Sequence, residues 1–103
     1  MTAYGFHPEA SVDIDDIWNF IAADNIDAAN RVAEDVLDAI DLLVAFPHHG
    51  YRRPELTSRP LRFQLLREYV IAYAPEKKPL WVVAVFHGRR NPRVIAAILR
   101  GRE

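Results

Sequence analysis

The spacing of apolar residues changes once along the chain, from a helical period to a strand-like period. Between residues 8 and 46, apolar residues recur every three or four positions, as on one face of a helix. One helix is expected to begin at Pro8, where the missing N–H costs nothing, and to end before Asp24 and Asn25. A second is expected from about Asp27, a plausible N-cap, to about residue 46, because Pro47 forbids continuation. The short break between them predicts an antiparallel helical hairpin.

After residue 60 the period becomes two, which is typical of strands. Strands are expected at residues 61–65, 69–74 and 80–87, joined by short connections that favour an antiparallel meander, with one more short strand at residues 2–6. The strand at 80–87 is apolar on both faces and needs cover on both, whereas a helical hairpin covers only one. The other face requires the tail, where residues 92–99 suit a short helix, or a second protein. We therefore predict a single α+β domain over residues 1–103, ordered β–α–α–β–β–β, with the helical hairpin packed on one face of an antiparallel sheet.

Composition excludes several classes of protein and of site. The 103 residues include no cysteine, so disulfides, thiolate metal sites and cysteine nucleophiles are excluded. No apolar run approaches the roughly 20 residues of a membrane span, and a basic-then-apolar signal pattern is absent, so we expect a soluble, cytoplasmic protein. No glycine-rich phosphate loop or nucleophile elbow is present. His48 and His49 are adjacent rather than at ligand spacing, so neither a metal nor another cofactor is expected.

Charge is distributed unevenly between the two halves of the chain. Residues 1–50 carry ten carboxylates and one base, whereas residues 51–103 carry four carboxylates and twelve bases. Eleven of the thirteen bases are arginine, whose planar fork suits phosphates and carboxylates better than lysine does. The basic half therefore suits a nucleic acid, an acidic protein segment, or neutralisation by the acidic half; apolar positions on an uncovered sheet face favour a protein partner.

His87 is the one histidine in a setting that suggests chemistry, because it ends an apolar strand and precedes Gly-Arg-Arg. A structural role at the strand end is the simpler interpretation. As a general base beside arginines it would favour cleavage at an RNA phosphate, with cations stabilising the developing charge.

Taken together, the motifs of this chain resemble the ParE/RelE superfamily of bacterial toxins, and the resemblance covers nearly the whole chain. It is carried by Ala10 and Ile17 in the early helix, and by Leu42-Leu43-x-x-Phe46-Pro47, Gly50-x-Arg52-Arg53-Pro54-Glu55-Leu56, Leu61-Arg62, Tyr69-Val70-Ile71-x-Tyr73 and Val83-x-Val85-x-His87-Gly88-Arg89-Arg90-Asn91. The resemblance implies a toxin neutralised by a cognate antitoxin, whose acidic or amphipathic C-terminal segment folds on contact.

The superfamily divides in function, and the run His87-Gly88-Arg89-Arg90 is more similar to the ParE branch, whose members inhibit DNA gyrase by binding. The resemblance then implies a toxic surface at Arg89, Arg90 and Arg93. For antitoxin contact we expect Arg62, Tyr73 and Trp81, because strand alternation puts some of them on the open sheet face. The alternative is a RelE-like, ribosome-dependent endoribonuclease that cleaves mRNA, for which the resemblance implies Arg62, Arg67, His87 and Arg89. The absence of a tyrosine after residue 73 counts against this alternative.

Overall fold

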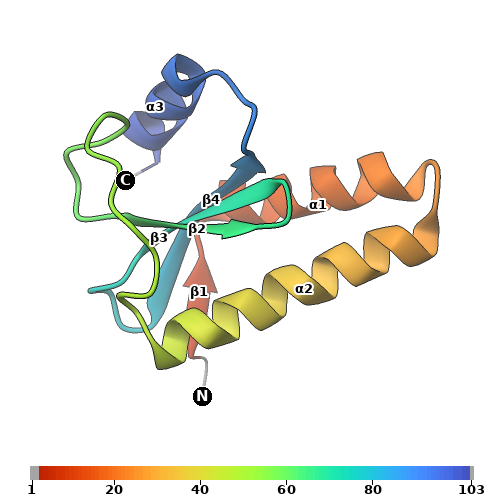
Figure 1. The fold of residues 1–103 in the computed structure, drawn as a ribbon, viewed down its shortest axis with the longest axis horizontal. Coiled ribbons are helices and arrows are strands. Elements are labelled where there is room, and N and C mark those ends of the chain that lie inside the picture. Colours follow the sequence, from red (N-terminus) through yellow and green to blue (C-terminus); the bar gives the residue numbers. More distant parts are fainter. Residues whose placement is uncertain (1–2, 103) are drawn as a thin grey trace.

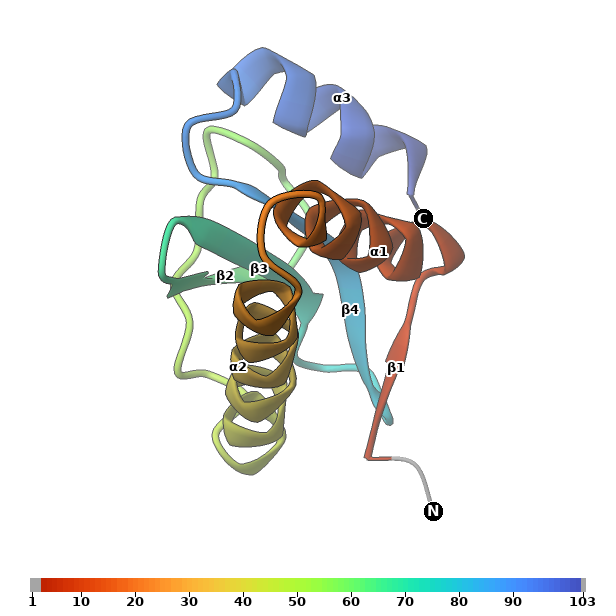
Figure 2. The same ribbon diagram turned by 90° about the vertical axis from the view of Figure 1, so that its right-hand side faces the viewer.

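A four-stranded sheet lies at the centre of the molecule, and helices pack on both of its faces (Figures 1 and 2). The computed structural model describes residues 3–102. In chain order the elements are β1 (Tyr4–Phe6), α1 (Pro8–Ala22), α2 (Ile26–Ala45), β2 (Arg62–Leu66), β3 (Tyr69–Ala74), β4 (Leu80–His87) and α3 (Pro92–Gly101). This is the predicted α+β order with a helix added at the end, so residues 92–99 do belong to a helix.

The sheet is mixed rather than purely antiparallel, with the strand order β1-β4-β3-β2. β2, β3 and β4 form the predicted antiparallel meander. β1, however, pairs with β4 in parallel, from Tyr4 opposite Leu80 to Phe6 opposite Val82. The expectation of an antiparallel sheet is corrected here, because the helical hairpin and the meander bring β4 back in the same direction as β1.

Both helices of the hairpin begin at side-chain caps. The Nδ1 atom of His7 accepts a hydrogen bond from the Glu9 backbone N–H at 3.1 Å, just before α1. Asn25, not Asp27, caps α2, because its Oδ1 atom accepts from the Ala28 backbone N–H at 3.0 Å. Asp27 instead lies in the first turn of α2, where a carboxylate interacts favourably with the helix dipole.

β4 is apolar on both faces because each face packs against an apolar cluster, and a β-bulge sets which residues face each side. Tyr73 pairs with Val82 and Ala72 pairs with Ala84, so Val83 is an extra residue that reverses the alternation. One apolar cluster faces α1 and α2, and the other faces α3. From β3 and β4 the first cluster takes Tyr69, Ile71, Tyr73, Leu80, Val82 and Val85, and the second takes Val70, Ala72, Ala74, Val83, Ala84 and Phe86.

The second sheet face is covered by the chain itself. Ile95 and Leu99 of α3 are buried against it, together with Leu56 from the loop that joins α2 to β2. Arg59 in the same loop secures the end of α3, because its Nη1 atom donates to the carbonyl oxygens of Leu99 and Arg102, each at 2.9 Å. The tail therefore supplies the cover that the sequence pattern requires.

Candidate functional site

The structure uses two of the arginines expected at a cleavage site to hold the fold. The Nη1 atom of Arg62 donates to the carbonyl oxygen of Gly50 at 2.7 Å, which ties β2 to the loop. Arg67 lies in the turn between β2 and β3, and its Nε and Nη2 atoms donate to Asp35 of α2 at 2.8 and 2.5 Å. Both guanidiniums therefore already hold partners within the fold in this conformation.

Arg62 and His87 also lie at opposite ends of the sheet. Arg62 pairs with Tyr73, whose neighbour in β4 is Val82, whereas His87 pairs with Tyr69. Four steps along β3 therefore separate Tyr73 from Tyr69, which is about 13 Å at the rise of a strand. Arg67, by contrast, follows Leu66, the partner of Tyr69, so Arg67, His87 and Arg89 lie at one end of the sheet and Arg62 lies at the other.

His87 makes contacts typical of a structural histidine at a strand end. Its Nδ1 atom accepts a hydrogen bond from the Arg89 backbone N–H at 3.1 Å, and its ring meets Tyr69 edge to face with 5.5 Å between centroids. Burial raises the pKa of Tyr69 above its ordinary value, and the nearby Glu68 carboxylate adds to this effect. Tyr69 therefore keeps its proton at neutral pH.

Tyr73, expected at the antitoxin contact, is fully buried beneath the helical hairpin. Its hydroxyl donates to the Pro47 carbonyl at 2.8 Å and accepts from the Gly50 N–H at 2.9 Å. Burial raises the pKa of this hydroxyl. The expectation for Tyr73 is wrong because odd-numbered positions of β3 face the hairpin, and nothing in strand alternation says which face is covered.

Trp81 is half-buried on the opposite face and lies at an open groove of about 340 Å³, which Arg59, Lys77 and Lys78 also line. Its ring passes over Gly5 of β1, where a Cβ would lie 2.8 Å from the ring and would therefore clash. Its role in antitoxin contact stays a prediction, as does that of Arg62.

The three arginines expected at the toxic surface, Arg89, Arg90 and Arg93, are all exposed where β4 leads into α3. Arg89 and Arg90 line a cleft of about 450 Å³ between α1 and the end of β4, and Arg93 is not among its lining residues. The remaining lining residues come from α1 and β4: Asp13, Asp16, Ile17, Phe20, Val85, Phe86 and His87.

An ion pair between distant parts of the chain closes one end of this cleft. Arg102 binds Asp13 of α1 through two hydrogen bonds of 2.5 and 3.0 Å, and its side chain is only 10% exposed. The hydrogen bond to Asp13 raises the pKa of Arg102. Both residues also form hydrogen bonds with backbone groups of β4 beyond the end of β1. Asp13 accepts from the Val85 N–H at 3.0 Å, and Arg102 donates to the Val83 carbonyl at 3.1 Å. The sequence carries no signal for this pair, since 89 positions separate its members.

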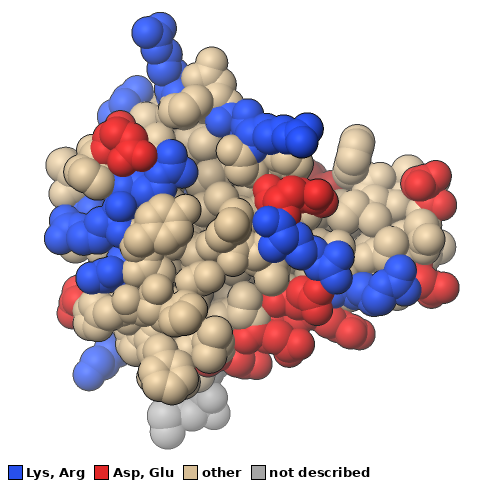
Figure 3. All heavy atoms as spheres, viewed as in Figure 1, with Lys and Arg blue, Asp and Glu red and all other residues tan. Residues whose placement is uncertain are grey.

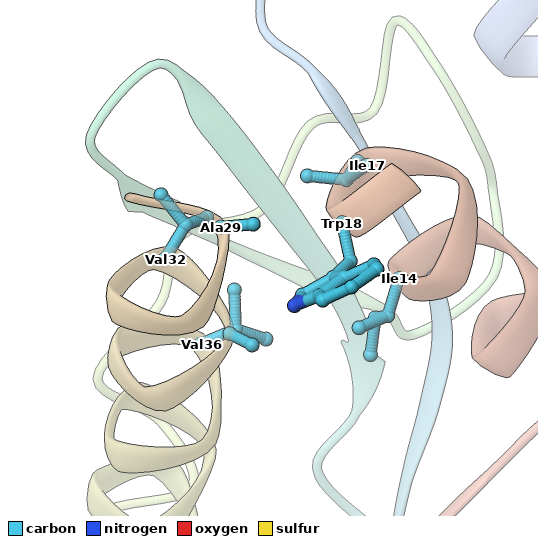
Figure 4. A pocket seen from close by; sticks show the side chains of 7 residues that line it. Ile14, Ile17, Trp18, Ala29, Val32 and Val36 are labelled. Atoms are coloured by element: carbon cyan, nitrogen blue, oxygen red, sulfur yellow. The ribbon is translucent and has the colours of Figure 1, made fainter. Parts of the chain in front are cut away.

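A second concavity, between α1 and α2, is part of the core rather than a ligand site (Figure 4). It holds only about 10 Å³, and apolar side chains surround the Trp18 ring there. The Trp18 Nε1–H donates to Asn30 Oδ1 at 2.9 Å, which satisfies the polar end of the ring. A small cavity with an apolar lining offers a ligand neither room nor polar partners.

Charge is segregated on the surface as it is in the sequence (Figure 3). In this view Asp and Glu side chains gather along α2, whereas Lys and Arg side chains spread over the rest of the face, from the 47–60 loop and α3 to the turn between β2 and β3. Arg53 in this loop donates to Glu55 at 2.9 Å, and this hydrogen bond lowers the pKa of Glu55. Part of the basic surface is therefore already neutralised by its own chain.

Within residues 3–102, the histidine and carboxylate side chains form no group of three or more that is arranged to hold a metal ion. His48 instead contacts Glu76 at 3.0 Å on the surface. Over the same residues, no helix combines the length and the apolar character that a membrane crossing requires.

Comparison with known proteins identifies one family. The family model described as "ParE toxin of type II toxin-antitoxin system, parDE" matches residues 4–92, from the first strand to the first residue of α3. No curated protein matches the chain.

Proposed function

Because the chain belongs to the ParE toxin family of type II toxin–antitoxin systems, we propose that it inhibits DNA gyrase by binding, through Arg89, Arg90 and Arg93. Family membership implies a cognate antitoxin that neutralises it. Gyrase inhibition is a more specific proposal than family membership, and the protein would carry it out in the cytoplasm.

The observation that carries this proposal is the different use of the arginines. Arg62 and Arg67 are engaged by a loop carbonyl and by Asp35, and Arg62 lies about 13 Å along the sheet from His87. Metal-independent RNA cleavage needs a base and cations around one phosphate. The arrangement supports binding over cleavage, because the arginines that remain exposed and next to one another in sequence are those after β4.

Pulse-labelling of DNA and protein synthesis after induced expression without antitoxin tests the choice of target. Gyrase inhibition predicts that DNA synthesis stops first and that cells filament while translation continues. Translation that stops within minutes, with mRNA cut at fixed codons on the ribosome, would refute the proposal in favour of a RelE-like endoribonuclease.

A supercoiling assay with purified gyrase tests the surface. Arg93→Glu is the sharpest variant, because Arg93 is exposed near the start of α3, where a glutamate suits the helix dipole and the fold is retained. Reversing a charge that faces the target should raise the inhibitory concentration at least about tenfold. Lys78→Glu, which makes the same charge change at the other end of β4, should inhibit like the wild type. Equal inhibition by both variants would remove Arg93 from the surface.

A further inference from the structure

The edge of β4 is open over the part of the strand that lines the cleft. β1 pairs with β4 only as far as Val82, and α1 takes its place beyond that point. Asp13 and Arg102 occupy the first backbone groups of the open edge, the Val85 N–H and the Val83 carbonyl. The sheet therefore continues past β1 without a strand on this side, within the part of the chain that the structure describes.

Strand geometry identifies the backbone groups that remain on this edge. Phe86 faces its β3 partner Val70, and the Gly88 N–H donates to the Glu68 carbonyl at 2.7 Å on the same side. Backbone groups alternate sides along a strand, so those of Val85 and His87 point away from β3, into the cleft. The His87 carbonyl already accepts from the Arg90 N–H at 3.0 Å, which leaves one acceptor, the Val85 carbonyl, and one donor, the His87 N–H.

The walls of the cleft differ in chemistry. One wall is basic, because Arg89 and Arg90 are exposed and the structure of residues 3–102 pairs neither with a carboxylate. The other wall is α1, where Phe20 is 82% exposed beside Ile17 and Asp16. A cleft of about 450 Å³ lies within the roughly 300–1,000 Å³ that binding sites enclose.

We propose that this cleft binds an extended, acidic segment of the cognate antitoxin, which pairs as a short strand with Val85 and His87. The segment would place carboxylates on Arg89 and Arg90 and an apolar side chain against Phe20. The inference rests on the proposed function. It adds that the antitoxin neutralises the toxin by directly covering Arg89 and Arg90, which are part of the proposed toxic surface. A nucleic acid fits the same cleft less well, because its backbone cannot pair as a strand with β4.

Amide hydrogen exchange of the purified toxin–antitoxin complex tests the pairing. The His87 amide should exchange more slowly in the complex than in the free chain, because it gains a hydrogen bond. The Leu65 amide is a matched reference on β2, at the other edge of the sheet. The N–H and carbonyl of Phe63 face outward to Tyr51. Because backbone groups repeat every two residues along a strand, the N–H and carbonyl of Leu65 also face outward. Protection at Leu65 without protection at His87 would overturn the proposal and put the added strand on β2.

Affinity measurements test the side chains with the full-length antitoxin. Arg89→Glu combined with Arg90→Glu should weaken binding at least about tenfold, because like charges would face the segment. Arg93→Glu, at an exposed position outside the cleft, should bind as the wild type does. Phe20→Ala should weaken binding while leaving the free chain as stable as before, because Phe20 is already 82% exposed. Unchanged affinity in the cleft variants would refute the proposal.

These measurements do not involve gyrase, so the two proposals fail separately. Gyrase that is insensitive to the chain would refute the proposed target and leave the antitoxin contacts unaffected. An antitoxin that binds without protecting His87 would refute the cleft and leave the target unaffected.

Discussion

The ion pair between Asp13 and Arg102 should be the most sensitive polar contact in the fold. The side chains are 18% and 10% exposed, so water screens the pair little. Asp13→Ala would leave the Arg102 guanidinium without its main counterion and the Val85 N–H without an acceptor. Arg102→Met would leave the Asp13 carboxylate and the Val83 carbonyl without their donor.

Removing one member of a buried ion pair costs about 3–5 kcal/mol, because the other charge stays behind uncompensated. We expect a loss of unfolding free energy at the lower end of this range, about 3 kcal/mol, for two reasons. Asp13 is partly exposed, and Glu9 lies 3.6 Å from Arg102 and partly replaces the lost counterion. A domain of this size has about 5–15 kcal/mol of unfolding free energy in total. Either variant should therefore lower the urea midpoint strongly while leaving a folded state to measure.

Urea unfolding followed by tryptophan fluorescence gives the free energies for the two single variants and for the double variant. The double variant removes both charges, so its loss should fall short of the sum of the single losses by about 2 kcal/mol. Asp16→Ala is the matched control one turn along α1, at an exposed position, and should change stability by less than about 0.5 kcal/mol. Single losses below about 1 kcal/mol, or strictly additive losses, would refute the assigned role of the pair.

Three further predictions concern buried or strained positions. Tyr73→Phe should lower the unfolding free energy by about 1–3 kcal/mol in urea, because it leaves the Gly50 N–H and the Pro47 carbonyl without their partner. The raised pKa of Tyr73 means that the unfolded chain ionises first, so stability should fall as pH rises above about 10, and Tyr73→Phe should reduce this alkaline loss in a pH series. Arg67 has a φ of 55°, which favours glycine, and its ion pair with Asp35 is exposed, so Arg67→Gly should be at least as stable as the wild type in thermal unfolding. A loss above about 1 kcal/mol would mean that the ion pair outweighs the backbone strain.

Local signals predicted most of the elements, since each lies between residues that stop it. β4 occupies the predicted residues 80–87, because Pro79 precedes it and Gly88 follows it. β3 likewise occupies the predicted residues 69–74. α2 begins one residue before the predicted start and ends one residue before the predicted end, and Pro47 accounts for the end. Periodicity succeeds here because it depends only on neighbours in the chain.

Apart from the N-cap of α2, which is Asn25 and not Asp27, the features that sequence reasoning missed are long-range. The parallel pairing of β1 with β4 joins residues more than 70 positions apart, and the bulge at Val83 appears only when the register with β3 is known. The burial of Tyr73 depends on which sheet face the hairpin covers. The cleft depends on where β1 stops and on the placement of Asp13 by α1. Spacing along the chain carries no information on any of these.

The uneven charge of the chain has a structural cause. Several arginines of the basic half hold the fold: Arg59 caps α3, Arg62 holds a loop carbonyl, and Arg67 and Arg102 pair with carboxylates of the acidic half. Each of these arginines donates at least two hydrogen bonds, which the planar guanidinium directs at fixed angles.

Arginines of the loop, of β2 and of the β2–β3 turn, together with Arg102 after α3, thus stabilise the fold, whereas the arginines after β4 lie on the surface beside the open edge of the sheet. The excess of arginine over lysine is therefore no measure of nucleic-acid binding in this chain. Among the residues that the structure describes, Arg89 and Arg90 form no ion pair with a carboxylate of the chain, so their guanidiniums are available to a partner.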